Sequence, residues 1–198
     1  SHSFHRAARA ELTVEVDMTE SVRLREEKRK EGIHISYTDI VVKAAAQALK
    51  EHPIMNSTLD DDQIKIFEDI NIGVAVATED GLIAPVVPNA DKKSLADISS
   101  CVNELIQKAR LRELSLDEIS GGTFTITNLG MFGVESFTPI INPPEAGILG
   151  VGKIGKKPVV VDDQVVVRPI MLITLSFDHR VVDGAPAAQF LQRLKQLL

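Results

Sequence analysis

Hydrophobic residues follow two different periods in this chain. Residues 11–17 place Leu12, Val14 and Val16 between polar neighbours, which predicts a strand with one buried face. Elsewhere apolar residues recur every three or four positions, which predicts amphipathic helices. The expected elements are, in chain order, a strand over 11–17, helices over 19–30 and from Ser36 or Thr38 to Pro53, a strand through Ile64 and Ile66, strands over 70–78 and 82–87, a helix from Ser94 to Ala109, strands over 123–127, 147–151, 159–167 (with a turn at Asp162-Asp163) and 171–177, and a helix over 185–197.

Local signals mark where several of these elements begin and end. Asp17 and Ser94 each precede an acidic residue by three positions, an arrangement typical of a helix N-terminus. The tripeptide Glu79-Asp80-Gly81 is typical of a hairpin turn, and a loop rich in Gly, Pro and Asn spans 128–144. The sequence contains no internal repeat, low-complexity tract or linker. It therefore predicts one α/β domain over 1–198 with a mixed sheet.

Composition and charge narrow the possible functions. The 198 residues are 44% hydrophobic and 25% charged, which is ordinary for a globular protein and argues against a disordered chain. The net charge of −6 argues against a broad nucleic-acid-binding face, but it is compatible with a local basic pocket for an anionic ligand. The apolar runs are too short for a membrane-spanning helix. The single cysteine, Cys101, cannot form a disulfide within the chain, and we expect it to be a small buried residue on a helix.

Two glycine motifs resemble phosphate-binding loops, but the residues that follow them do not fit such a loop. Residues 147–153 have the glycine and lysine spacing of a P-loop, but Ile154 stands where the Ser or Thr that holds Mg²⁺ is needed. Residues 150–155 match Gly-x-Gly-x-x-Gly, but a Val-rich strand follows instead of a helix. The histidines have no metal-ligand spacing, so we expect no metal site. Four of them are expected to be solvated or capping residues: His2, His5, His34 and His52.

The segment 178–184, Asp-His-Arg-Val-Val-Asp-Gly, is the strongest candidate for chemistry. His179 stands at the end of a predicted strand, a rigid position with an exposed tip. Its neutral imidazole could act as a base, and Asp183 follows four positions later. The alternative is that His179 and Asp183 only cap the final helix.

The same heptad resembles the signature of the dihydrolipoyl acyltransferases, the core components of the 2-oxoacid dehydrogenase complexes. Four further stretches resemble the family in the same order along the chain, so the resemblance covers nearly all of it. They are 81–88 (Gly-Leu-Ile-Ala-Pro-Val-Val-Pro), 90–95, 121–130 (Gly-Gly-Thr-Phe-Thr-Ile-Thr-Asn-Leu-Gly) and 137–152.

The resemblance implies a fold and a reaction. The fold would be a two-layer sandwich with a mixed sheet, similar to chloramphenicol acetyltransferase. The reaction would be direct acyl transfer between a lipoyl thiol and coenzyme A, without an acyl-enzyme. His179 would be the general base, and Asp183 would organise the active-site loop through an ion pair. Thr127 would stabilise the oxyanion at a position where the family usually has Ser; the alternative is an ordinary strand residue.

The resemblance also implies an assembly. The site would lie between subunits of a homotrimer, with His179 of one subunit facing the Thr127 strand of the next, and trimers would build a large cage. The final leucines could then dock on a neighbouring subunit. The chain would be an N-terminally truncated catalytic domain without the lipoyl and peripheral subunit-binding domains. The catalytic domain would act on the lipoyl domain of the full-length chain, and the decarboxylase and the dihydrolipoyl dehydrogenase would be bound through the missing domains.

The sequence leaves other properties open. The sequence does not identify the acyl group, the coenzyme A and lipoyl pockets or the cage size. We expect no nucleic-acid or membrane partner and a cytoplasmic location, with the mitochondrial matrix as the alternative. Two rival functions are an acyltransferase of the same fold with a hydroxyl acceptor and a non-catalytic scaffold subunit.

Overall fold

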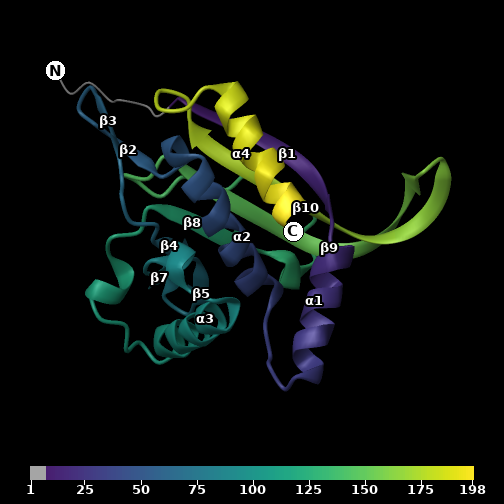
Figure 1. The fold of residues 1–198 in the computed structure, drawn as a ribbon. Helices are drawn as coiled ribbons and strands as arrows, with labels where there is room; N and C mark the ends of the chain where they lie inside the picture. The colour runs from purple at the N-terminus through teal and green to yellow at the C-terminus, as the bar shows by residue number, and fades with distance from the viewer. Residues whose placement is uncertain (1–7) are drawn as a thin grey trace.

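The computed structural model describes residues 8–198 (Figure 1), so His2 and His5 lie outside the described residues. A six-stranded sheet forms its centre, and four helices and two short hairpins surround the sheet. The sheet strands are β1 (Arg9–Asp17), β4 (Ile72–Val74), β7 (Val86–Val87), β8 (Phe124–Asn128), β9 (Gly147–Val161) and β10 (Gln164–Asp178). The hairpins are β2 (Ser57–Asp60) with β3 (Gln63–Ile66), and β5 (Val76–Thr78) with β6 (Gly81–Ile83). The helices are α1 (Thr19–Lys30), α2 (Tyr37–Glu51), α3 (Leu95–Arg110) and α4 (Gly184–Leu197).

The sheet is mixed, as the sequence predicts. Its strand order is β1-β10-β9-β8-β4-β7. The pairs β1–β10, β10–β9 and β4–β7 are antiparallel, whereas β8 runs parallel to both β9 and β4. β8 therefore lies in the interior of the sheet between two parallel neighbours.

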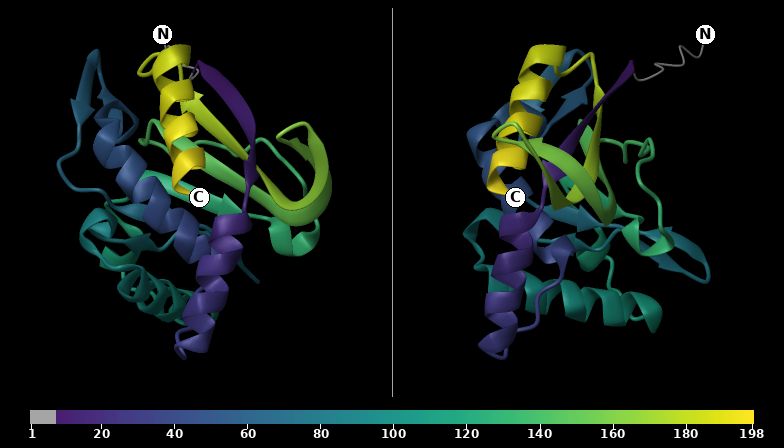
Figure 2. Two further views of the ribbon diagram at one scale, coloured as in Figure 1. Left: turned by 45° about the vertical axis from the view of Figure 1, so that its right-hand side comes forward. Right: turned by 90° about the vertical axis from the view of Figure 1, so that its right-hand side faces the viewer.

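The helices and the sheet form two layers. Figure 2, in its right-hand view, shows α1, α2 and α4 on one side of the sheet and the β5–β6 hairpin on the other. Phe124 of β8 faces the helices, since its ring lies 5.7 Å from that of Phe190 on α4, centroid to centroid. Because side chains alternate along a strand, Thr125 and Thr127 point to the opposite face. The predicted two-layer arrangement is confirmed.

Helix α2 packs at the centre of the helical layer and begins at the expected signal. Ser36, not Thr38, is the N-cap residue: its hydroxyl accepts from the Asp39 N–H at 3.0 Å, and the Asp39 carboxylate accepts from the Ser36 N–H at 2.8 Å. Such a capping box satisfies two backbone donors that a helix end leaves free. Ser94 caps α3 as predicted, since its hydroxyl accepts from the Asp97 N–H at 3.1 Å.

The predicted cap of α1 is wrong. Met18 occupies the N-cap position without a capping side chain, and Asp17 instead accepts hydrogen bonds from the Thr19 N–H and hydroxyl at 3.0 and 2.6 Å. Met18 is held by the sheet, because its N–H donates to the Pro169 carbonyl at 2.8 Å and its side chain is fully buried. The strand-to-helix junction is thus set by tertiary packing.

The strands predicted over 70–78 and 82–87 are each divided in two. β4 and β7 belong to the sheet, whereas β5 and β6 pair only with each other, around the predicted turn at Glu79-Asp80-Gly81. The division falls at Ala75 on one side and at Ala84-Pro85 on the other. Pro85 has no N–H to donate to a ladder, which favours a break at that point. The β5–β6 hairpin therefore projects from the sheet.

β9 and β10 are each continuous, whereas the sequence predicted separate strands over 147–151, 159–167 and 171–177. Pro158 pairs with Val167, and Pro169 pairs with Lys156. The pairing of β8 with β9 ends at Val151 and that of β1 with β10 ends at Ile170, so β9 and β10 continue beyond both as a two-stranded ribbon. Proline is tolerated there because a ribbon has free edges that need no N–H partner. The predicted turn at Asp162-Asp163 closes the ribbon.

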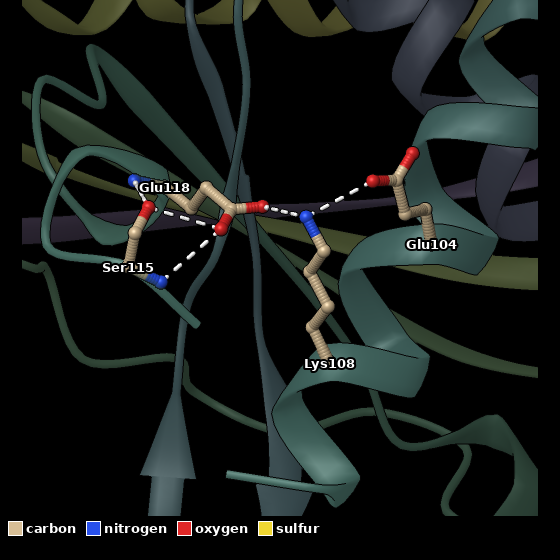
Figure 3. Close-up of polar contacts among 4 residues, drawn as sticks. All are labelled: Glu104, Lys108, Ser115 and Glu118. Carbon is tan, nitrogen blue, oxygen red and sulfur yellow. Dashed lines mark hydrogen bonds and ion pairs between the residues drawn. The ribbon is translucent and has the colours of Figure 1, made fainter. Parts of the chain in front are cut away.

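A polar network fixes the segment that leads from α3 into β8 (Figure 3). The Lys108 ammonium lies 3.0 Å from the carboxylates of both Glu104 and Glu118. Glu118 also accepts from the Ser115 N–H and hydroxyl at 3.1 and 2.9 Å. These hydrogen bonds lower the pKa of Glu118, and the bonds to Glu104 and Glu118 raise that of Lys108. The network holds the turn that carries Ile119, which reaches the cavity described below.

Candidate active site

His179 stands at the end of β10, where the sequence analysis placed it. Its N–H donates to the Ala8 carbonyl at 2.7 Å, and the N–H of Asp178 donates to the Ala146 carbonyl at 2.9 Å. Its ring lies 5.9 Å from the buried ring of Phe177, centroid to centroid, and its side chain is 50% exposed. The backbone of His179 is therefore fixed while its ring stays open to a ligand.

An ion pair supports the turn that carries His179. The guanidinium of Arg180 donates from Nε and Nη2 to the carboxylate of Asp178, at 3.0 and 2.6 Å, and the Arg180 N–H donates to the same carboxylate at 3.0 Å. Burial by itself raises the pKa of Asp178, but the bonds from Arg180 outweigh it, so this pKa lies below its ordinary value. Asp178 is therefore ionised at neutral pH and locks the turn.

Replacing Arg180 by Met is expected to destabilise the protein at neutral pH by about 1–3 kcal/mol, because the buried Asp178 carboxylate loses its charged donor. The Asp178 pKa is depressed in the folded protein, so the pair stabilises above the pKa of the unfolded state and this effect is lost as pH falls through the folded pKa. Urea unfolding at neutral and acidic pH measures the difference. An Arg180→Met penalty that grows as the pH is lowered would contradict this role.

Asp183 lies next to His179 at the start of α4. It occupies the N-cap position, but its side chain makes no capping hydrogen bond. The carboxylate is 86% exposed and its Oδ1 lies 3.9 Å from Nδ1 of His179. Among residues 8–198, the imidazole of His179 is the basic group within ion-pair distance of Asp183. The geometry does not support the alternative of a helix cap made by both side chains.

Thr127 lies on the face of the sheet opposite the helices and lines a cavity of about 620 Å³. β8 forms one wall, the β5–β6 hairpin a second and the segment 137–143 a third. The lining is mostly apolar, and it contains no charged side chain among the described residues. Its polar groups are those of Thr125, Thr127, Thr138 and Asn142.

The sheet register separates Thr127 from His179 within one chain. Thr127 pairs with Gly150, and Gly150 pairs with Thr174. His179 follows Thr174 on the same strand, which places it roughly 16 Å along the strand and roughly 10 Å across two strand spacings from Thr127. The structure therefore brings His179 and Asp183 together, but neither of them meets Thr127.

Glu145, a buried acid beside the cavity, is a candidate that the sequence motifs do not indicate. Only 6% of the residue is exposed. Its carboxyl oxygens bond to the Thr125 hydroxyl at 2.6 Å and to the Asn142 amide at 3.2 Å. Burial raises the pKa of Glu145 to about 7, although both hydrogen bonds lower it. An acidic residue between Pro-Pro and a buried apolar strand was the available signal.

The remaining sequence candidates do not form sites. Cys101 is half-buried on α3, and burial raises the pKa of its thiol, which does not favour a reactive thiolate. Both glycine motifs lie inside β9, where Gly152 permits close approach to the Glu135 carbonyl. No group of metal-ligating side chains occurs among residues 8–198. Within the same residues, no helix has the length and apolarity to cross a membrane.

Comparison with known proteins gives consistent matches. A family model described as "2-oxoacid dehydrogenases acyltransferase (catalytic domain)" matches residues 1–198. The acetyltransferase component of the Rickettsia bellii pyruvate dehydrogenase complex is 43% identical, over 94% of this chain and 46% of its own. The succinyltransferase component of the Rickettsia typhi 2-oxoglutarate dehydrogenase complex is 42% identical, over 93% of this chain and 48% of its own. The chain thus spans about half the length of these relatives.

Solved structures match over nearly the whole chain. The cubic core of a pyruvate dehydrogenase multienzyme complex is 37% identical with a TM-score of 0.93, over 97% of this chain and 82% of its own. Dihydrolipoamide acetyltransferase from Azotobacter vinelandii gives the same values, and its study concerns a serine, a histidine and an asparagine in the catalytic mechanism. A chloramphenicol acetyltransferase is 17% identical with a TM-score of 0.65, over 96% and 88% of the two chains, which confirms the predicted fold.

Proposed function

The chain belongs to the acyltransferase family of the 2-oxoacid dehydrogenase complexes, and we propose that it transfers an acyl group between coenzyme A and a dihydrolipoyl thiol. The observation that carries this proposal is the exposed His179–Asp183 pair at the end of β10. Thr127, His179 and Asp183 have the same spacing in the sequence as the serine, histidine and asparagine studied in the Azotobacter enzyme. Two of the three residue types differ, but the chemical groups remain suited to the same roles.

His179 acts as the general base. A thiol with a pKa of about 8.5 is only about 3% thiolate at pH 7, so its nucleophilicity depends on removal of the proton. The half-exposed imidazole takes this proton as the sulfur attacks the carbonyl carbon of the thioester. When the tetrahedral intermediate collapses, the other sulfur leaves and takes the proton back from His179. No acyl-enzyme is formed in this sequence.

Asp183 stabilises the charged form of His179. The imidazole becomes an imidazolium when it holds the proton, and the carboxylate 3.9 Å away then forms an ion pair with it. Asp183 is highly exposed in the described chain, so this pair gains strength only where a neighbouring subunit or substrate excludes water. Asp183 organises the active-site loop and stabilises the imidazolium form of His179, and it accepts no proton.

Thr127 supplies the hydrogen bond to the oxyanion. Attack on the thioester places a negative charge on the carbonyl oxygen, and a positioned donor stabilises that charge best where water is excluded. Thr127 is buried at the wall of an apolar cavity, which is such an environment. Its β-branched side chain also has few χ1 rotamers, so the hydroxyl is held in few directions.

The acyl group belongs to the uncharged class. The lining of the cavity beside Thr127 contains no charged side chain among the described residues. Placing a succinyl carboxylate there would bury a charge without a partner, which is unfavourable. An acetyl or branched-chain acyl group has only apolar surface beyond the carbonyl and fits this lining.

The test is acyl transfer to dihydrolipoamide from acetyl-, isobutyryl- and succinyl-coenzyme A. We expect activity with at least one uncharged donor and kcat/KM at least about tenfold lower with the succinyl donor. A hydroxyl acceptor used in preference to dihydrolipoamide would support an acyltransferase of another type. An intact assembly that transfers no acyl group to either acceptor would support a scaffold.

Within this proposal the chain assembles as a homotrimer, and trimers build a cage. Two observations support it: the resemblance to a cubic core, and the apolar side chains that are exposed on the ribbon and loops. These are Met131, Phe132, Ile140, Val160, Val165 and Val167. The sequence predicts that the final leucines could dock on a neighbouring subunit, but Leu198 is not free to do so. It is buried, and its carbonyl accepts a hydrogen bond from the Ser21 hydroxyl.

The proposed partners follow from the family. One is the lipoyl domain of the full-length protein. The others are the decarboxylase and the dihydrolipoyl dehydrogenase, which other domains of a longer protein would bind. The substrates are coenzyme A and a lipoyl group carried on a separate domain. The relatives named above are bacterial, which favours the cytoplasm over the mitochondrial matrix.

A further inference from the structure

Glu145 joins three segments that are distant in the sequence. Its backbone forms a bridge to Thr58 of β2, whose hydroxyl donates to the Pro144 carbonyl at 2.6 Å. Its carboxyl bonds to Thr125 in the middle of β8 and to Asn142 in the segment before β9. Thr125 and Asn142 both line the cavity, on two different walls. Glu145 therefore connects these walls through its side chain.

The carboxyl is buried and has no charged neighbour among the described residues. The Gly122 backbone packs close to it, since a Cβ added at Gly122 would stand in contact with Oε2 of Glu145, at 3.4 Å. Burial, Thr125 and Asn142 are the influences on the Glu145 pKa, and no charged group of the described residues is among them. A carboxylate with one neutral donor for each oxygen is poorly stabilised, so the group changes its protonation state near neutral pH.

The two protonation states place the proton of the Thr125 hydroxyl differently. The carboxylate can only accept, so Thr125 must donate to it across 2.6 Å. The protonated acid can donate to Thr125, and the Thr125 hydroxyl is then free to donate elsewhere. Gly73 leaves space beside this hydroxyl, since a Cβ at Gly73 would lie 3.1 Å from it. Because Thr125 lines the cavity, a substrate atom bound there can accept a hydrogen bond from the freed hydroxyl.

We propose that Glu145 is a positioning residue for acyl transfer, which connects two walls of the cavity and sets whether the Thr125 hydroxyl donates to Glu145 or into the cavity. Thr125 stands two residues before Thr127 on the same face of β8. A donor there can bind an acceptor atom of the substrate next to the reacting carbonyl. This inference rests on the proposed function and concerns the same cavity.

The test compares Glu145→Gln with the wild type. The amide of Gln can donate to Thr125 and accept from Asn142, so the variant keeps the arrangement of the protonated acid at every pH. The assay measures KM and kcat for acetyl transfer from acetyl-coenzyme A to dihydrolipoamide over roughly pH 5.5–8.5. We expect the ratio of the wild-type KM to the Glu145→Gln KM to increase about 2- to 10-fold as pH rises through neutrality. This is the size of effect expected when the wild type loses one hydrogen bond to the substrate.

Two control variants make the result specific. Glu27→Gln removes an exposed carboxylate on α1, and its pH profile should follow the wild type. Thr125→Val removes the hydroxyl, so adding Glu145→Gln to it should produce no further change in the pH dependence of KM. Thr125→Ser keeps the hydroxyl and should keep the wild-type profile, which separates loss of the hydrogen bond from loss of the fold.

The outcomes are distinct. If Glu145→Gln changes KM or kcat by the same factor at every pH, or leaves both unchanged, Glu145 has no protonation-dependent role and the inference is wrong. If the wild type transfers no acyl group, the proposed function fails and the role of Glu145 fails with it. An active wild type with a pH-dependent difference from Glu145→Gln supports both.

Discussion

Replacing His179 by alanine is expected to lower kcat for acyl transfer by about 10²–10⁴-fold, because the attacking thiol loses the base that takes its proton. KM for coenzyme A and for dihydrolipoamide should change much less, since the imidazole acts on the reacting sulfur and contributes little to binding. Steady-state transfer from acetyl-coenzyme A to dihydrolipoamide measures both quantities. A rising pH should partly rescue the variant, because it supplies more thiolate without a base.

The control for this prediction is His34→Ala, which removes an exposed histidine far along the sequence from the turn of His179. It should retain wild-type kcat. The role assigned to His179 would be contradicted if His179→Ala kept kcat within a few-fold of the wild type, or if both histidine variants lost activity equally.

Replacing Thr127 by valine is expected to lower kcat by about 10²–10³-fold, the usual effect of removing one oxyanion donor. Valine has nearly the same shape as threonine, so β8 and the cavity should keep their structure. Thr127→Ser keeps the hydroxyl and should retain most of the activity. If valine and serine at position 127 had the same kcat, Thr127 would be an ordinary strand residue.

The elements with strong local signals could be predicted from the sequence. Ser94 with Asp97 fixed the start of α3, and the alternation around Val14 fixed β1. Two other predictions failed for reasons that are not local. Met18 takes the cap position of α1 in place of Asp17 because the sheet holds it. β9 continues across the gap predicted between 151 and 159 because the ribbon there has free edges, which tolerate Pro158.

The candidate site was predicted in part. The position of His179 at a strand end and its closeness to Asp183 follow from a short segment, and the structure confirms both. The separation of Thr127 from His179 depends on the register of β8, β9 and β10, which no local pattern contains. Glu145 could not be predicted from the sequence, because its raised pKa comes from burial and its hydrogen bond is made with Thr125, twenty residues earlier in the chain.

From this separation we propose that His179 and Thr127 act in one site only when they come from two subunits. The direct measurement is the activity of trimers reassembled from equal amounts of His179→Ala and Thr127→Val chains, each of which is nearly inactive alone. If the site lies between subunits, random mixing pairs an intact His179 with an intact Thr127 at roughly one quarter of the interfaces, and roughly one quarter of wild-type activity should return. Activity that stays at the level of the separate variants, in reassembled trimers shown to contain both chains, would contradict a site between subunits.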